Sequence, residues 1–168
     1  QPWTGGGLHF SFFNQPVAAQ TNYEMFIKSL IPLIESDKNI LKKLIDIKDS
    51  FSSSMKQEIE SMWTKKLGLQ CFNRKIVDEL HSLMLESKVD YTIFFRILSL
   101  MPDDSESLKD SFYQPSSEKL NFKWNNWLRQ WKYSLRNNVD RKSLSEELKK
   151  INPKYTWREW IIAPAYKN

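Results

Sequence analysis

Apolar residues recur at intervals of three and four along most of this chain, which is the spacing of one face of an α-helix. The clearest stretch begins at Leu120 and continues through Trp124, Trp127, Leu128, Trp131 and Leu135. The chain has only four glycines, three of them consecutive at positions 5–7, so it lacks the many tight turns of an all-β protein. The pattern predicts an all-α fold, an irregular multi-helix bundle.

The N-terminal part divides into an extended segment and the start of a helical domain. Residues 1–14 mix glycines with aromatic residues and are predicted to be extended, whereas residues 15–168 are predicted to form a single helical domain. Asn14 is suited to cap the first helix, and Pro32 should end or kink it. The apolar positions of this helix are Val17, Met25, Phe26, Leu30 and Leu33.

Serines and one glycine divide the next apolar stretch. Ser36 and Asp37 offer an N-cap, after which we expect two helices that are separated by the serine run at positions 52–54. Gly68 supplies the left-handed residue that ends the second of them.

A strongly apolar segment lies in the middle of the chain. Asn73 is predicted to cap one helix and Asp90 the next, over residues 91–101, where apolar residues occur on nearly every side. This second helix should be the most deeply buried, and Pro102 should end it. Arg96 lies within it and needs a charged or carbonyl partner, for which we expect a carboxylate.

Residues 103–118 are predicted to form a loop with one short helix at 108–112. The tryptophan stripe after this loop has two interpretations. All its members share one helical face, so we expect it to be core, and the alternative is a platform on which nucleic-acid bases stack.

The C-terminal part contains two further start signals. Ser143 and Glu146 form a capping box for a helix over residues 144–151. Asn152 and Pro153 are predicted to open a last helix that bears Trp157, Trp160 and Ile161 and is closed by Pro164.

The charge pattern does not favour a nucleic-acid interface. The formal net charge is +5, but the basic residues alternate with acidic ones. The densest basic positions are the pairs Lys42-Lys43, Lys65-Lys66 and Lys149-Lys150, which are shorter than the stripe that a nucleic-acid groove needs. Arg96 interrupts the longest apolar run, so no membrane span is predicted.

The residue types that carry chemistry are sparse. One cysteine, Cys71, excludes an internal disulfide, and with only His9 and His81 there are too few ligands for a Cys/His metal site. We expect Cys71 to be a half-buried small apolar residue and His81 to be structural. The glycines at 5–7 are followed by no Lys-Ser/Thr pair, so no phosphate loop is present. We therefore predict no catalytic, cofactor-binding or metal-binding residue in this chain.

Three stretches, in order along the chain, resemble the selenoprotein O family. The first is Phe10-Ser11-Phe12-Phe13-Asn14-Gln15-Pro16, and the second runs from Lys65-Lys66-Leu67-Gly68-Leu69 to Asp90-Tyr91-Thr92 and Phe94-Phe95-Arg96. The third is Trp127-Leu128, followed by Asn152-Pro153-Lys154-Tyr155 and Arg158, which is similar to the family's Asn-Pro-Lys-Tyr-x-x-Arg-Asn signature except that Glu159 replaces the last Asn.

This resemblance implies that the chain is the carboxy-terminal portion of a kinase-like protein adenylyltransferase and resembles the helical lobe of that fold. Members transfer AMP from ATP, with magnesium, to Ser, Thr or Tyr hydroxyls of proteins, and their catalytic and metal-binding residues lie upstream of the Asn-Gln-Pro tract. The implied partners are a missing N-terminal ATP-binding lobe and protein substrates, in the mitochondrion for a eukaryotic member or the cytoplasm for a bacterial one. The alternative is a non-catalytic helical interaction module derived from the family. Arg158 is expected to tie the last helix to the body of the domain.

Overall fold

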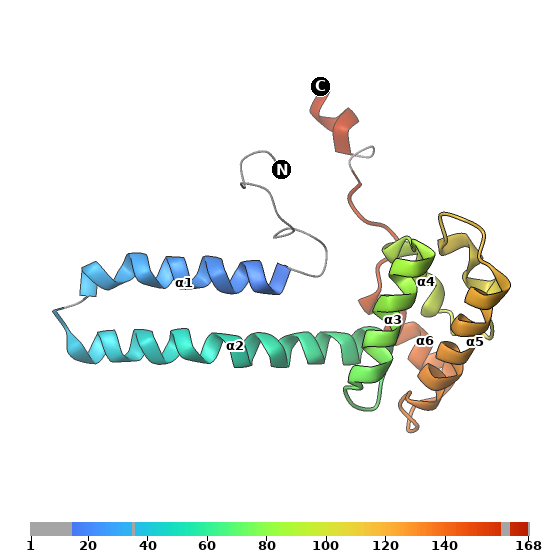
Figure 1. The fold of residues 1–168 in the computed structure, drawn as a ribbon, viewed down its shortest axis with the longest axis horizontal. Helices are drawn as coiled ribbons and strands as arrows, with labels where there is room; N and C mark the ends of the chain where they lie inside the picture. Colours follow the sequence, from blue (N-terminus) through green and yellow to red (C-terminus); the bar gives the residue numbers. More distant parts are fainter. Residues whose placement is uncertain (1–14, 35, 159–161, 168) are drawn as a thin grey trace. The chain divides into compact units, whose positions relative to one another are not determined.

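A computed structural model describes residues 15–34, 36–158 and 162–167, and Figure 1 shows its elements. They are α1 (Gln15–Ile34), α2 (Lys38–Leu67), α3 (Arg74–Ser87), α4 (Tyr91–Leu98), the 3₁₀-helix η1 (Glu106–Ser111), α5 (Glu118–Tyr133), α6 (Arg141–Ile151) and the 3₁₀-helix η2 (Ala163–Lys167). Every regular element in these ranges is a helix, so the all-α prediction is confirmed. The chain forms two compact units, one that ends at Ile59 and one that begins at Glu60. The prediction of a single domain over 15–168 stays a prediction, as does that of an extended segment at 1–14, which lies outside the described residues.

In the first unit, α1 and the first part of α2 form an antiparallel helical hairpin (Figure 1). The rings of Tyr23 and Phe51 stack across it with their centroids 4.2 Å apart, and Ile27 is buried one turn further along α1. Pro32 lies in the last turn of α1, which continues for two residues beyond it. Asp37 caps α2 as predicted, since its carboxylate accepts hydrogen bonds from the N–H groups of Asn39 and Ile40.

The predicted break in α2 is wrong. The helix runs without interruption through the serines at 52–54, because the apolar frame at Phe51, Met55 and Ile59 keeps helical spacing across them. The hydroxyl of Ser53 donates to the carbonyl of Ser50, so it is satisfied within the helix and does not compete with the helical backbone.

Gly68 ends α2, as the sequence predicts. Its φ of +67° lies in the left-handed region, and a β-carbon there would lie only 3.1 Å from Leu144 Cδ1. The next residue, Leu69, forms an isolated antiparallel bridge with Leu135, which joins the end of α2 to the end of α5.

The core of the second unit is built around the tryptophans of α5. Trp124, Trp127 and Trp131 are all at most 1% exposed, which supports the core interpretation over the base-stacking platform. Each indole N–H also has a partner: Trp124 donates to Ser87 Oγ at 2.8 Å, Trp127 to the carbonyl of Ile76 at 2.9 Å and Trp131 to that of Leu67 at 2.8 Å. The stripe therefore fills the core and also fixes α2 and α3 against α5.

Helix α4 is shorter than predicted. Asp90 caps it by accepting from the N–H of Ile93, but the helix ends at Leu98 rather than at residue 101. Pro102 disfavours the helical conformation of the residue before it, and Met101 adopts a φ of +61°. The short helix predicted at 108–112 is present as η1, which packs against α4.

Two predicted start signals near the C-terminus are wrong. Asp140, and not Ser143, caps α6, because its carboxylate accepts from two backbone N–H groups and starts the helix three residues earlier. Asn152 is the C-cap of α6, and Pro153 follows it as the residue that cannot continue a helix. Residues 153–158 are not helical and Trp157 is exposed, while the predicted positions Trp160 and Ile161 lie outside the described residues.

Within the described ranges, none of the helices combines the length and the apolar character that crossing a bilayer requires.

We predict that Trp127→Ala lowers the free energy of unfolding by roughly 3–5 kcal/mol, because it opens a cavity and removes a buried indole that donates a hydrogen bond. Urea unfolding followed by circular dichroism measures the loss. The control is Tyr133→Ala, since Tyr133 lies on the same helix but is 90% exposed and should change stability by no more than about 0.5 kcal/mol. A loss below about 1 kcal/mol for Trp127→Ala would contradict its assignment to the core.

Candidate functional site: a buried polar network at the end of α6

Residues of the second and third family-like stretches converge in the second unit around Asn152. This residue is fully buried, and its side chain makes three hydrogen bonds. The carboxamide oxygen accepts from Lys66 Nζ at 2.9 Å, and the carboxamide nitrogen donates to the carbonyl of Lys66 at 3.1 Å and to Ser99 Oγ at 3.0 Å. One side chain therefore joins the ends of α2, α4 and α6.

Arg96 lies beside this carboxamide, and its predicted carboxylate partner is wrong. Its Nη1 donates to the backbone carbonyls of Lys149 at 3.0 Å and Asn152 at 3.3 Å. These are among the last carbonyls of α6, which have no partner within the helix. A cation at a helix C-terminus is also favoured by the helix dipole. Arg96 is thus a C-terminal cap of α6, supplied by α4.

Lys66 is held between this network and an aromatic surface. Its ammonium lies 4.2 Å from the ring centroid of Phe95 and 5.0 Å from that of Tyr91, within the range of cation–π contacts. Burial lowers the pKa of Lys66 to about 8. Burial also raises the pKa of Tyr91 to about 12.

Lys66 was not predicted to differ from its neighbour Lys65, although the sequence contains a signal that separates them. Lys66 follows the buried Trp63 by three residues, so it falls near the inward face of α2, whereas Lys65 does not. Ser99 was missed as well, and its only signal is its place one residue after an apolar helix.

A second cluster joins the C-terminal segment to the start of α4. Arg158 Nη2 lies 2.8 and 2.7 Å from the two carboxylate oxygens of Asp90, and the hydroxyl of Tyr113 donates to Asp90 at 3.0 Å. Burial by itself would raise the pKa of Asp90, but the hydrogen bonds from the Ile93 N–H, Arg158 and Tyr113 outweigh it and hold this pKa below its usual value. The predicted tie through Arg158 is therefore present, although the segment that carries it is not a helix.

Cys71 and His81 contribute no chemistry to either cluster. Cys71 is exposed, contrary to the expectation that it is half-buried, because it lies in the turn after Gly68 and not on the packed face of a helix. The ring of His81 packs edge-on against Trp63 with centroids 4.8 Å apart. The pKa of His81 lies below its usual value. Burial lowers it most, Asp78 raises it in part, and the positive charge of Arg74 lowers it further.

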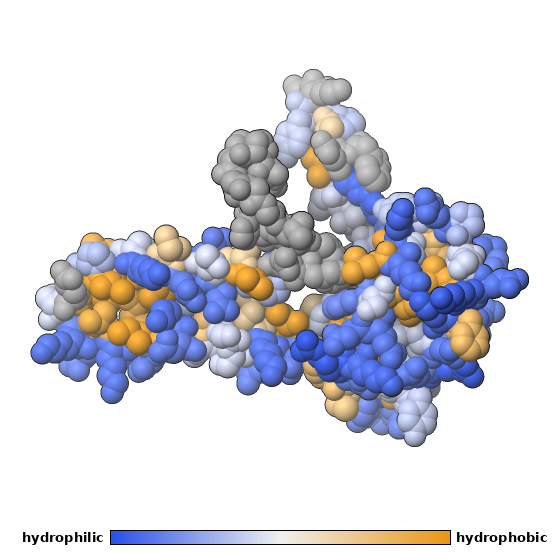
Figure 2. Space-filling model, in the orientation of Figure 1, coloured by the Kyte–Doolittle hydropathy of each residue, from blue (hydrophilic) through white to orange (hydrophobic). Residues whose placement is uncertain are grey.

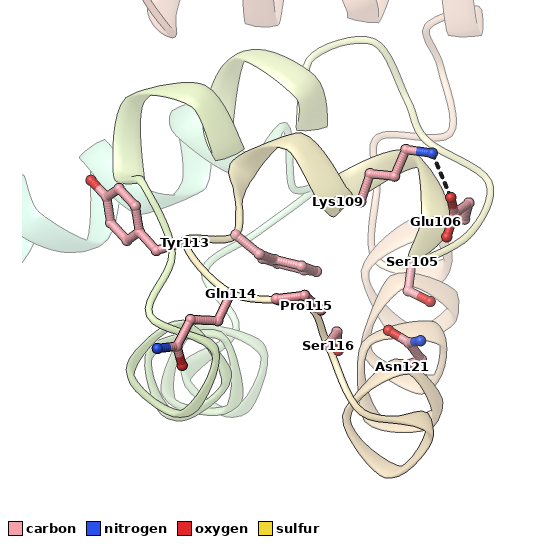
Figure 3. A pocket seen from close by; sticks show the side chains of 9 residues that line it. Ser105, Glu106, Lys109, Tyr113, Gln114, Pro115, Ser116 and Asn121 are labelled. Carbon is pink, nitrogen blue, oxygen red and sulfur yellow. Dashed lines mark hydrogen bonds and ion pairs between the residues drawn. The ribbon is translucent and has the colours of Figure 1, made fainter.

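A pocket of about 420 Å³ lies next to the second cluster (Figure 3). Its lining comes from η1 and the loop before α5, together with Asn121 of α5: Ser105, Glu106, Lys109, Phe112, Tyr113, Gln114, Pro115, Ser116 and Asn121. Lys109 is paired with Glu106 at 2.6 Å, so its charge is compensated within the pocket wall. The lining offers no convergent set of cations for a triphosphate.

The described residues do not fit an ATP–magnesium site. In the ranges that the structure describes, no three His, Cys, Asp or Glu side chains gather where they could hold a metal ion. The polar groups of both clusters bind one another instead of facing a cavity. This arrangement holds the ends of the helices of the second unit in place.

Comparison with known proteins identifies the family of this scaffold. The family described as "Protein adenylyltransferase SelO" matches residues 6–168, so the chain belongs to this family and the resemblance is confirmed. Proteins named "Protein nucleotidyltransferase YdiU" are similar to it. The one from Aromatoleum aromaticum is 28% identical over 172 residues, covering 95% of this chain and 31% of the relative. The one from Salmonella enteritidis is 27% identical over 162 residues (93% and 32%), and the one from Pseudoalteromonas translucida is 33% identical over 94 residues (54% and 20%). The chain spans about a third of the length of the first of these curated relatives.

We predict that the free energy of unfolding rises between pH 8 and pH 10 relative to a Lys66→Met variant. The folded-state pKa of Lys66 is lowered to about 8 from 10.5, so in this window the unfolded chain binds more protons than the folded chain, and raising the pH favours folding. The window stops at pH 10 because the raised pKa of Tyr91 acts in the opposite direction above it.

Urea midpoints measured at intervals across this range test the prediction. Lys65→Met removes an exposed lysine from the same helix and should keep the pH dependence of the parent. If the urea midpoints of the parent and of Lys66→Met change with pH in parallel, the prediction is wrong, because Lys66 then binds its proton equally well in the folded and the unfolded chain.

Proposed function

We propose that this chain is the carboxy-terminal helical part of a protein adenylyltransferase, which transfers AMP from ATP to Ser, Thr or Tyr hydroxyls of protein substrates. In this reaction the hydroxyl oxygen bonds to the α-phosphate of ATP and pyrophosphate leaves. The nucleotide and magnesium ligands belong to an N-terminal ATP-binding lobe outside this chain, and the helical part supports that lobe.

One observation carries this proposal: the family match covers residues 6–168, while the polar residues of the matched stretches hold one another. The family signature around Asn152 and Arg158 thus has a structural explanation that requires no substrate. The curated relatives are about three times as long as the chain, which leaves room for a separate catalytic part. Their names assign them nucleotidyl transfer to proteins.

The second candidate is a non-catalytic helical interaction module that kept the scaffold. Both candidates agree with the poor fit of the described residues to ATP and magnesium. The two candidates differ in one respect, which is whether this chain can complete a catalytic lobe.

For the compartment, we propose the cytoplasm if the host is bacterial, as the hosts of the relatives named above are, and the mitochondrion if it is eukaryotic.

We predict that the 168-residue chain alone does not bind Mg-ATP in a calorimeter, and that it supports AMP transfer when it replaces the matched segment of the Aromatoleum aromaticum relative. Transfer is read as labelled AMP bound covalently to protein. The controls are the intact relative and the relative without its matched segment, which should be active and inactive respectively. Micromolar binding by the chain alone would overturn the placement of the ATP site, and a folded but inactive chimera would favour the interaction module.

A further inference from the structure

Helix α1 has two apolar faces, and only one of them is covered by α2. Tyr23 and Ile27, which are four residues apart, mark the face that packs on α2. At 100° per residue, a second set with helical spacing begins about 60° from Tyr23, on the side away from Ile27, and extends to about 160° from it. We call it the outer face of α1, and it consists of Ala18, Asn22, Met25, Phe26, Ser29 and Leu33.

The outer face is exposed and uncharged. Met25 is 61%, Phe26 57% and Leu33 77% exposed, and Figure 2 shows hydrophobic surface along the visible side of the hairpin. The two charged residues of α1, Glu24 and Lys28, lie between the two faces and not on the outer one. A surface helix normally turns charged residues to solvent, and a helix that is apolar all round is normally buried.

The hairpin also lacks a core of its own. Among the described residues of the first unit, Ile27 is the one hydrophobic side chain that is buried. Isolated helices have little stability without the burial of an apolar face. Both observations indicate that another body covers this unit.

We propose that the outer face of α1 is the docking surface for the catalytic lobe of the same protein, an inference that rests on the proposed function. The curated relatives hold about two thirds of their length outside the segment that this chain matches, which is enough for such a body. The outer face has no charged residue, so its counterpart is an apolar patch on that lobe and not an ionic site. This contact explains why Met25, Phe26 and Leu33, three of the predicted apolar positions of α1, are exposed in the chain by itself.

Thiol labelling in the chimera with the Aromatoleum aromaticum relative tests this contact, with Cys71→Ser as the background. Ser29→Cys places a thiol on the outer face, and Ser53→Cys places a matched thiol on the side of α2 that points away from α1. A maleimide read peptide by peptide by mass spectrometry should modify position 29 at least roughly ten-fold more slowly in the chimera than in the isolated chain, because access then requires the interface to open. Position 53 should be modified at the same rate in both.

Equal rates at position 29 in a folded chimera would overturn the docking surface. Protection of position 29 already in the isolated chain would overturn it too, and loss of that protection on dilution would identify a second copy as the occupant. AMP transfer is measured in the same samples, so an inactive chimera counts against the proposed function and leaves the labelling result to decide the docking surface.

As a second measurement, Phe26→Ser should leave the urea midpoint of the isolated chain unchanged and lower that of the chimera. The matched control is Phe122→Ser, at a phenylalanine of α5 that is 66% exposed. It should affect the urea midpoint equally in the isolated chain and in the chimera. An equal effect of Phe26→Ser in both proteins would contradict the proposal.

Discussion

The carboxamide of Asn152 is the contact on which the second unit depends. It satisfies a carbonyl at the end of α2, fixes the ammonium of Lys66 and binds the hydroxyl of Ser99 at the end of α4. These residues are far apart in the sequence. Without the carboxamide, the carbonyl and the ammonium of Lys66 would lose this partner, whereas the hydroxyl of Ser99 would keep its bond to the carbonyl of Phe95. Asparagine suits this position because it has both a donor and an acceptor on one short, uncharged side chain. The helices around it could hardly shift without breaking several bonds together.

Charged groups complete the arrangement at the helix ends. Arg96 donates to the carbonyls at the end of α6, and Arg158 holds the carboxylate that caps α4. Arg96 therefore compensates the partial negative charge of the carbonyls at the end of α6, and Arg158 compensates the negative charge of Asp90 at the start of α4. The same polar residues that make the family recognisable thus explain the geometry of the scaffold.

Several local features of this fold could be read from the sequence, whereas the buried contacts around Asn152 could not. Asp90 as a cap, Gly68 as a stop and the tryptophan stripe follow from spacing and from the chemistry of neighbouring residues. Asn152 was misread as the start of a helix, because an Asn-Pro pair suits either end and only contacts with α2 and α4 decide between them. The partners of Arg96 could not be predicted either, since backbone carbonyls leave no signal in the sequence.

The stability of an Asn152→Ala variant, measured by urea unfolding against Pro153→Ala, tests the structural role of the signature most directly. Pro153 is exposed, so its substitution reports the effect of a change at the neighbouring position. If the carboxamide joins α2, α4 and α6, Asn152→Ala lowers the free energy of unfolding by more than about 2 kcal/mol, since at least two buried polar groups lose their partner. A variant that unfolds at the urea midpoint of the parent would contradict this account and leave Asn152 without a structural reason to be buried.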